Sequence, residues 1–116
     1  MNRRGVESRR LVDDILQYGR TLAHWVSKGH DAFLDAETGS QATIERQFEM
    51  IEEAATALGA SFRKANPQIP WDPIFEIRNE ISHPYQLQYD RERLWVFVRD
   101  DLPKILARLR RPVYPD

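Results

Sequence analysis

A chain of 116 residues with a formal net charge of -1 has the length of one domain, spanning residues 1–116, and can bury a core of its own. It contains no cysteine, which excludes disulfides, thiolate metal sites and a cysteine nucleophile, and favours a reducing compartment. No apolar run is long enough to cross a bilayer, and charged residues follow Met1 where a signal peptide would be apolar, so we expect a soluble cytoplasmic protein that does not enter membranes.

The first predicted element is an amphipathic helix over residues 6–27, which Gly29 ends. Between residues 30 and 41, polar and glycine residues surround Phe33 and Leu34, which indicates a short helical turn held in a loop by two apolar side chains. The helical spacing over residues 6–27 is carried by Leu11, Ile15, Leu22, Trp25 and Val26.

The clearest helical pattern lies in the middle of the chain. Its apolar residues follow one another at intervals of four and three, which predicts a central core helix over residues 42–64. Pro67 and Pro70 then favour extended backbone in the residue before each of them. The residues of the central stripe are Ile44, Phe48, Ile51, Ala55, Leu58 and Phe62.

Two further helices complete the chain. One is predicted to begin at Asp72, whose side chain can cap free amides, with Pro73 in the first helical position. It cannot continue regularly past His83, because Pro84 follows. The last pattern, residues 94–109, predicts a long helix that Pro103 kinks. The fold class is therefore all-α: an antiparallel four-helix bundle with a kinked C-terminal helix and a short extra helical turn.

Basic residues gather in two places, although the net charge gives no overall attraction for nucleic acid. A function on RNA would have to rest on such local patches. The alternative interpretation is that they are solvated helix faces, because acidic residues are interleaved nearby. One cluster lies near the start and one along the last helix: Arg3, Arg4, Arg9 and Arg10, and Arg99, Lys104, Arg108, Arg110 and Arg111.

The segment from Arg78 to Tyr85 concentrates polar side chains that could carry chemistry. Arg78 borders the apolar face of its helix, and the break at Pro84 lets His83 swing back beside the helix end. A set of Arg, Asn and His without a thiol or a metal-ligand cluster suits phosphodiester transfer. The imidazole of His83 would shuttle a proton, and the guanidinium of Arg78 would stabilise the developing anion.

A purely structural interpretation of the same segment stays open. Arg78 could pair with an acidic neighbour such as Glu53 or Glu80. His83 could be a satisfied helix cap, and Tyr85 could pack in the core with its hydroxyl hydrogen-bonded. His24 and His30 have no carboxylate or histidine partner at ligand spacing and are interpreted as surface or packing residues, and Trp25, Trp71 and Trp95 as core or dimer-interface anchors.

Several stretches match one known family in order and approximate spacing. They are Arg46 to Ala55, Pro67 to Trp71 leading to Ile74, the motif Arg78-Asn79-x-x-x-His83-x-Tyr85, Trp95, and Asp101 to Pro103. Over roughly residues 9–110 the chain resembles the HepT-like family of HEPN-domain ribonuclease toxins. The resemblance implies a HEPN four-helix bundle that forms a homodimer, with two copies of the motif in a shared, composite active-site cleft.

The same resemblance implies a function. It is that of the toxin of a type VII HEPN and minimal-nucleotidyltransferase toxin–antitoxin system, a metal-independent endoribonuclease that needs no cofactor. Its partners would be an RNA substrate and a cognate minimal nucleotidyltransferase antitoxin, which neutralises the toxin by attaching adenylate to the motif tyrosine.

Carried over onto this sequence, the resemblance implies a role for each motif residue. Arg78 would stabilise the transition state, and His83 would be the general acid or base as a ribose 2'-hydroxyl attacks the neighbouring phosphate. Asn79 would position one of them, and Tyr85 would be the target of adenylylation. Glu53 matches the family's glutamate and could brace Arg78 or its counterpart in the dimer.

The sequence departs from the family pattern in three places. Pro84 stands between His83 and Tyr85, where the family often has a small or flexible residue; Glu52 stands where the family pattern Ile-Gly-Glu-Ala has glycine; and the interval from Tyr85 to Trp95 is one residue longer. Two other functions therefore stay open. The chain could be a non-catalytic module that binds a nucleotide or the nucleotidyltransferase, or a structural dimerisation domain.

Overall fold

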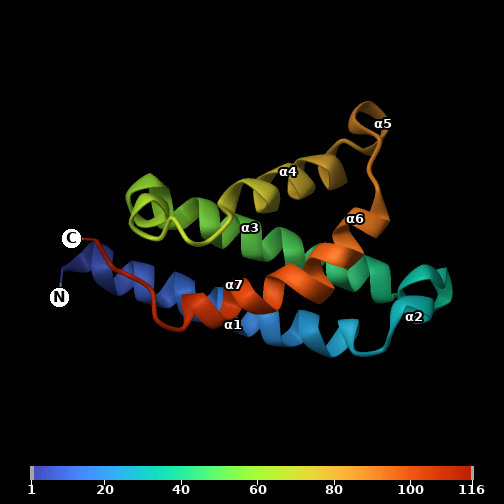
Figure 1. The fold of residues 1–116 in the computed structure, drawn as a ribbon, viewed down its shortest axis with the longest axis horizontal. Helices are drawn as coiled ribbons and strands as arrows, with labels where there is room; N and C mark the ends of the chain where they lie inside the picture. Colours follow the sequence, from blue (N-terminus) through green and yellow to red (C-terminus); the bar gives the residue numbers. More distant parts are fainter. Residues whose placement is uncertain (1, 116) are drawn as a thin grey trace.

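The computed structural model describes residues 2–115, in which there are helices and no strand (Figure 1). This confirms the predicted all-α class. None of the described helices is both long and apolar enough to span a bilayer. In chain order the elements are α1 (Arg3–Val26), α2 (His30–Leu34), η1 (Ala36–Thr38), α3 (Ser40–Ala65), α4 (Trp71–Ser82), α5 (Pro84–Leu87), α6 (Arg91–Val96), the π-helical turn η2 (Phe97–Asp101) and α7 (Leu102–Leu109).

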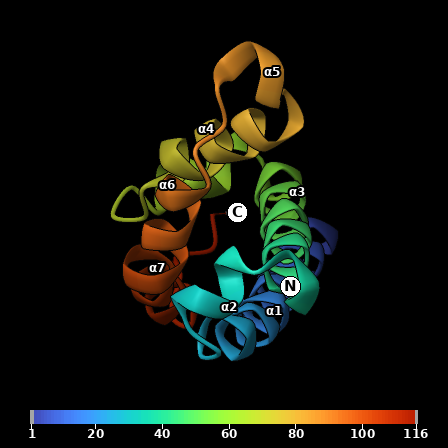
Figure 2. The same ribbon diagram turned by 90° about the vertical axis from the view of Figure 1, so that its right-hand side faces the viewer.

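The long helical segments form the antiparallel bundle that the sequence predicts. α1 and α3 share the most extensive contact, α4 packs on α3, and the rod made of α6, η2 and α7 packs on α1. Figure 2 looks along the bundle and shows these segments arranged around a common core. All six residues of the predicted central stripe are at most 2% exposed. Burial of each large apolar side chain contributes about 1.5–3 kcal/mol.

The central helix is broken, which corrects the prediction of one regular helix over residues 42–64. Gly59 has φ 87° and ψ 165°, a conformation that glycine alone adopts without strain. Arg63 stabilises the break, because its Nη1 donates to the carbonyls of Ala55 (2.8 Å) and Thr56 (3.3 Å) in the last turn before it. Phe62, beyond the break, is still buried.

The start of α4 also differs from the prediction. The helix begins at Trp71 with Pro70 as its N-cap, and no side-chain capping bond forms, so Asp72 is not the cap. The indole decides this boundary. Trp71 is buried, and its Nε1 donates to the carbonyls of Arg63 (3.2 Å) and Asn66 (3.1 Å), which anchors the first residue of α4 to the end of α3.

The predicted irregularity in the C-terminal helix is present and takes the form of η2. The amide of Leu102 donates to the carbonyl of Phe97, five residues earlier, and Pro103 follows in the first turn of α7. Proline has no N–H to donate and its ring crowds the preceding turn, so a widened turn just before Pro103 accommodates it. Beyond α7, the buried side chain of Asn66 holds Val113 through two hydrogen bonds of 2.8 Å, one to the carbonyl and one from the amide.

The predicted extra turn appears as α2, with Phe33 fully buried. The sequence did not reveal a carboxylate partner for His30. Its Nε2 lies 2.7 Å and 2.9 Å from the two carboxylate oxygens of Glu92, 62 positions away, and its ring packs on Trp95 at 5.3 Å. His30 therefore ties α2 to α6. Trp71 and Trp95 are buried core anchors, as expected from their apolar neighbours.

Candidate active site

Three of the predicted site residues meet in one place. Arg78, Asn79 and His83 line an open pocket of about 550 Å³ at the C-terminal end of α4. The other residues around this pocket are Glu52, Phe75, Glu76 and Ser82. Two sequence-predicted residues lie outside it, namely Tyr85 and Glu53.

The end of α4 brings His83 beside Arg78. The helix stops at Ser82, and His83 is its C-cap with φ -129° and ψ 58°. The amide of His83 donates to the carbonyls of Asn79 (3.0 Å) and Glu80 (3.3 Å), so the turn is closed by backbone hydrogen bonds. Pro84 then opens α5. Because proline cannot extend α4, the side chain of His83 leaves the helix register and is exposed at the pocket.

The carboxylate next to Arg78 belongs to Glu52 of α3. The distance from Arg78 Nε to Glu52 Oε1 is 3.8 Å, with the two side chains 27% and 17% exposed. This is an ion pair and is too long for a hydrogen bond, and Arg78 Nε is buried without a hydrogen-bond partner. Thr56 holds the other oxygen of Glu52 by donating its hydroxyl at 2.9 Å. The charge of Arg78 is thus partly offset inside the pocket.

Neither acidic neighbour considered from the sequence pairs with Arg78 within this chain. Glu53 is exposed, and a role for it toward a second copy stays a prediction. Glu80 pairs instead with Arg93 of α6, which also binds Glu76 at 2.9 Å. The sequence marks Glu52 as unusual, because a glutamate stands where the family pattern has glycine. Its contact with Arg78 arises from the packing of α3 on α4, and the apolar pattern of a single helix does not show which residues of another helix it meets.

Tyr85 is fully accessible. It lies on α5, which projects from the bundle (Figures 1 and 2), and its side chain is 99% exposed. Tyr89, four residues later, is different, since its hydroxyl donates to Glu45 Oε2 at 2.7 Å. Burial and this hydrogen bond raise the pKa of Tyr89 well above that of a free tyrosine. Of these two phenols, Tyr85 is the exposed one.

Similarity to known proteins agrees with this arrangement. The sequence model of the family described as "Ribonuclease HepT-like" matches residues 15–111. A protein of Methanocaldococcus jannaschii, named by inference as an RNase, is 29% identical over 106 residues, which cover 90% of this chain and 94% of that protein. A protein of Thermococcus cleftensis, named by inference as ribonuclease HepT, is 28% identical over 72 residues, which cover 62% of this chain and 64% of that protein.

No solved structure matches the chain significantly. The family match extends over more than four-fifths of the sequence and includes the whole of α4, which carries Arg78, and its C-cap His83. The chain therefore belongs to the HepT-like family of ribonucleases.

Proposed function

We propose that this chain is a metal-independent endoribonuclease that cleaves RNA by attack of a ribose 2'-hydroxyl on the neighbouring phosphate. The observation that carries the proposal is the shared pocket of Arg78, Asn79 and His83, which combines a cation, an amide and an imidazole at an open surface. The names of the two relatives support the same substrate class.

In this reaction the 2'-oxygen forms a bond to phosphorus and the bond from phosphorus to the 5'-oxygen breaks. A base takes the 2'-proton and an acid protonates the leaving 5'-oxygen, so the products are a 2',3'-cyclic phosphate and a 5'-hydroxyl. His83 acts as the acid or the base. Arg78 stabilises the charge that develops on the phosphoryl oxygens, and Asn79 positions the phosphate or the imidazole.

One pocket holds one imidazole, whereas the reaction needs both an acid and a base. A homodimer with two copies of the motif in a composite cleft supplies the second group. The exposed side chain of His83 and the openness of the pocket are compatible with a second subunit approaching it.

If the chain is the toxin of a toxin–antitoxin pair, modification of Tyr85 would regulate its ribonuclease activity. In that case its antitoxin, a minimal nucleotidyltransferase, transfers adenylate from a nucleoside triphosphate to the phenol of Tyr85 and releases pyrophosphate. The 99% exposure of Tyr85 supports this role. The added phosphate would carry a negative charge two residues from His83, where it opposes the binding of RNA.

The test is cleavage of labelled RNA in excess EDTA, with analysis of the fragment ends. Cyclic-phosphate ends are expected from the wild-type protein, with a loss of about 10²–10⁴ in rate for His83→Ala and Arg78→Ala. Gln86→Ala, an exposed change on α5, is the matched control and should cleave normally. Tyr85→Phe should cleave RNA but resist adenylylation. A pure dimeric protein that cuts nothing refutes the catalytic function.

One observation favours a second candidate, a non-catalytic module that binds a nucleotide or the nucleotidyltransferase. The carboxylate of Glu52, 3.8 Å from Arg78 Nε, offsets charge that a catalytic arginine would direct at the phosphate. This alternative predicts no cleavage but measurable affinity for a nucleotide or the partner enzyme, and loss of that affinity in Arg78→Ala.

A further inference from the structure

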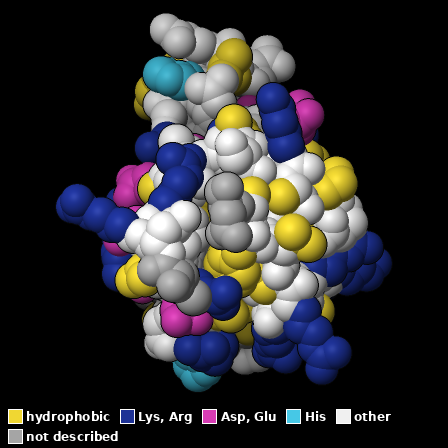
Figure 3. Space-filling model, turned by 90° about the vertical axis from the view of Figure 1, so that its left-hand side faces the viewer, with side chains coloured by type: hydrophobic (Ala, Val, Ile, Leu, Met, Phe, Trp, Pro, Cys, Tyr) yellow, Lys and Arg dark blue, Asp and Glu magenta, His cyan; other side chains and the backbone are white. Residues whose placement is uncertain are grey.

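The charges of the chain are separated along the molecule. Residues 2–12, 60–70 and 108–115 contain nine Lys and Arg residues and a single acidic residue, Glu7, although the whole chain has a formal net charge of -1. The fold brings these three stretches to one end, where the N- and C-termini also lie (Figure 1). Figure 3 faces this end and shows more dark blue basic side chains than magenta acidic ones.

Direct contacts join the three stretches. Asn66, just after α3, holds Val113 of the C-terminal segment by two hydrogen bonds of 2.8 Å. The guanidinium of Arg9 in α1 lies 4.1 Å from the ring centre of Tyr114. The two basic clusters that are remote in sequence, one at the start of α1 and one at the end of α7, therefore form one surface.

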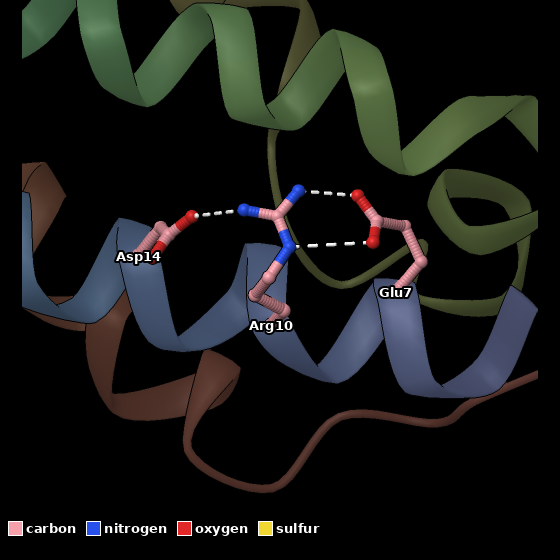
Figure 4. A network of polar contacts seen from close by, with 3 residues as sticks. All are labelled: Glu7, Arg10 and Asp14. Carbon is pink, nitrogen blue, oxygen red and sulfur yellow. Dashed lines mark hydrogen bonds and ion pairs between the residues drawn. The ribbon is translucent and has the colours of Figure 1, made fainter. Parts of the chain in front are cut away.

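Part of this charge is used inside the molecule. Arg10 lies between Glu7 and Asp14 and pairs with both, as Figure 4 shows. Arg63 donates to the carbonyl of Ala55. Arg108 donates to a backbone carbonyl as well. Arg9 lies over the ring of Tyr114. The other five cations of these stretches are exposed and form no ion pair with any residue from 2 to 115; we call them the basic end, and they are Arg3, Arg4, Lys64, Arg110 and Arg111.

The pocket of the candidate active site carries little net positive charge. It contains one arginine, Arg78, whose charge Glu52 partly offsets, and the carboxylate of Glu76, which pairs with Arg93. The stretches that carry the basic end lie on the side of the molecule from which α4 starts, and His83 caps the other end of α4 (Figure 1). With 12 residues α4 is about 18 Å long, so the two places are at least about 18 Å apart. At about 3.4 Å per stacked nucleotide this is a span of at least about five nucleotides.

We propose that the basic end is an anchor for the sugar-phosphate backbone of RNA, which holds the strand while a segment at least about five nucleotides away enters the pocket at His83. The identity of the polyanion as RNA rests on the proposed ribonuclease function. Binding would be independent of sequence and would be driven by the release of counterions from each phosphate that an arginine or lysine neutralises. Short oligonucleotides, which cannot reach both places, would be poor substrates.

The test measures equilibrium binding of a fluorescent 20-nucleotide single-stranded RNA between 50 and 200 mM salt, with every protein carrying His83→Ala so that none cleaves it. Arg4→Ala/Arg110→Ala/Arg111→Ala removes three cations of the basic end. At about 0.7 per lost phosphate contact, the slope of log K against log salt should become shallower by about 2. At 0.1 M salt this corresponds to a loss of affinity of up to about a hundredfold.

A matched control removes the same charge from arginines that are already in ion pairs: Arg10→Ala/Arg46→Ala/Arg99→Ala. It should change the slope by less than half as much. Equal effects of the two triple variants would mean that net charge alone matters, and would overturn the proposal. An unchanged affinity and slope in the basic-end variant would overturn it too.

Two further outcomes separate this proposal from neighbouring ones. If the basic-end variant binds RNA normally but self-associates less in sedimentation at low salt, the surface contacts a second copy of the chain and the RNA anchor is refuted. If RNA binds through the basic end but the protein with His83 intact never cleaves it, the anchor is supported and the ribonuclease function fails.

Discussion

The substitution Gly59→Ala tests whether α3 is broken at Gly59, because its effect on the free energy of unfolding has opposite signs in a regular helix and in a broken one. In an exposed, regular helix, glycine to alanine stabilises a protein by about 1 kcal/mol. Here Gly59 has φ 87° and ψ 165°, a region in which a residue with a Cβ costs of order 1–3 kcal/mol. The added Cβ would also lie 3.0 Å from Arg4 Nη2, but that flexible side chain can move at small cost. We therefore expect destabilisation by about 2 kcal/mol.

Thermal unfolding followed by far-ultraviolet circular dichroism measures this change. With an unfolding entropy of about 2.1 cal/mol/K per residue, 2 kcal/mol in a chain of 116 residues lowers Tm by about 8 °C. Ser61→Ala, an exposed change two residues further on, is the control and should stay within about 0.5 kcal/mol of the wild type. An unchanged or higher Tm for Gly59→Ala would show that α3 is continuous and that the reasoning is wrong.

Three other changes test other parts of the structure. Asn66→Ala removes the three hydrogen bonds of a fully buried side chain, two with Val113 and one with the carbonyl of Phe62, so urea unfolding should show a loss of about 3 kcal/mol; a loss under 1 kcal/mol would contradict this role of Asn66. Tyr89→Phe removes the bond to Glu45 and should cost about 1.5 kcal/mol at pH 7. Because the pKa of Tyr89 is raised in the fold, its contribution to stability should be constant below about pH 10 and be lost above it. Urea midpoints of Tyr89→Phe should therefore fall less steeply than those of the wild type above about pH 10, and parallel profiles in this range would refute this. Glu52→Gln removes a negative charge beside Arg78, so RNA binding in the His83→Ala background should tighten by about 1 kcal/mol, or roughly fivefold. Weaker binding of this variant in an anisotropy titration would show that Glu52 does not offset the charge of Arg78.

Short-range patterns explain why much of the fold was predictable. The apolar stripe from Ile44 to Phe62 is a periodic signal, and every one of its residues is buried. Proline effects are equally local, because they act on the backbone of the neighbouring residue and on the preceding helical turn. Pro84 ends α4 at the expected place, and Pro103 lies directly after the π-helical turn.

The errors arose where a distant residue decided the local structure. The regular spacing of the apolar stripe around Gly59 predicts a continuous helix there, whereas the break depends on Arg63 and on the turn that leads to α4. Asp72 is a residue type that often caps helices, but the indole of Trp71, bonded to carbonyls at the end of α3, places the first helical residue two positions earlier than predicted.

By itself the sequence determined the helical class, the main apolar faces and the location of the Arg78 to Tyr85 motif, because periodicity, proline and residue chemistry are local properties. The tertiary structure decided which charges meet. It placed Glu52 beside Arg78, paired Arg93 with Glu76, and joined two remote basic clusters into one end of the molecule. Such contacts depend on how helices pack against one another, and a one-dimensional pattern does not record the partner across the interface.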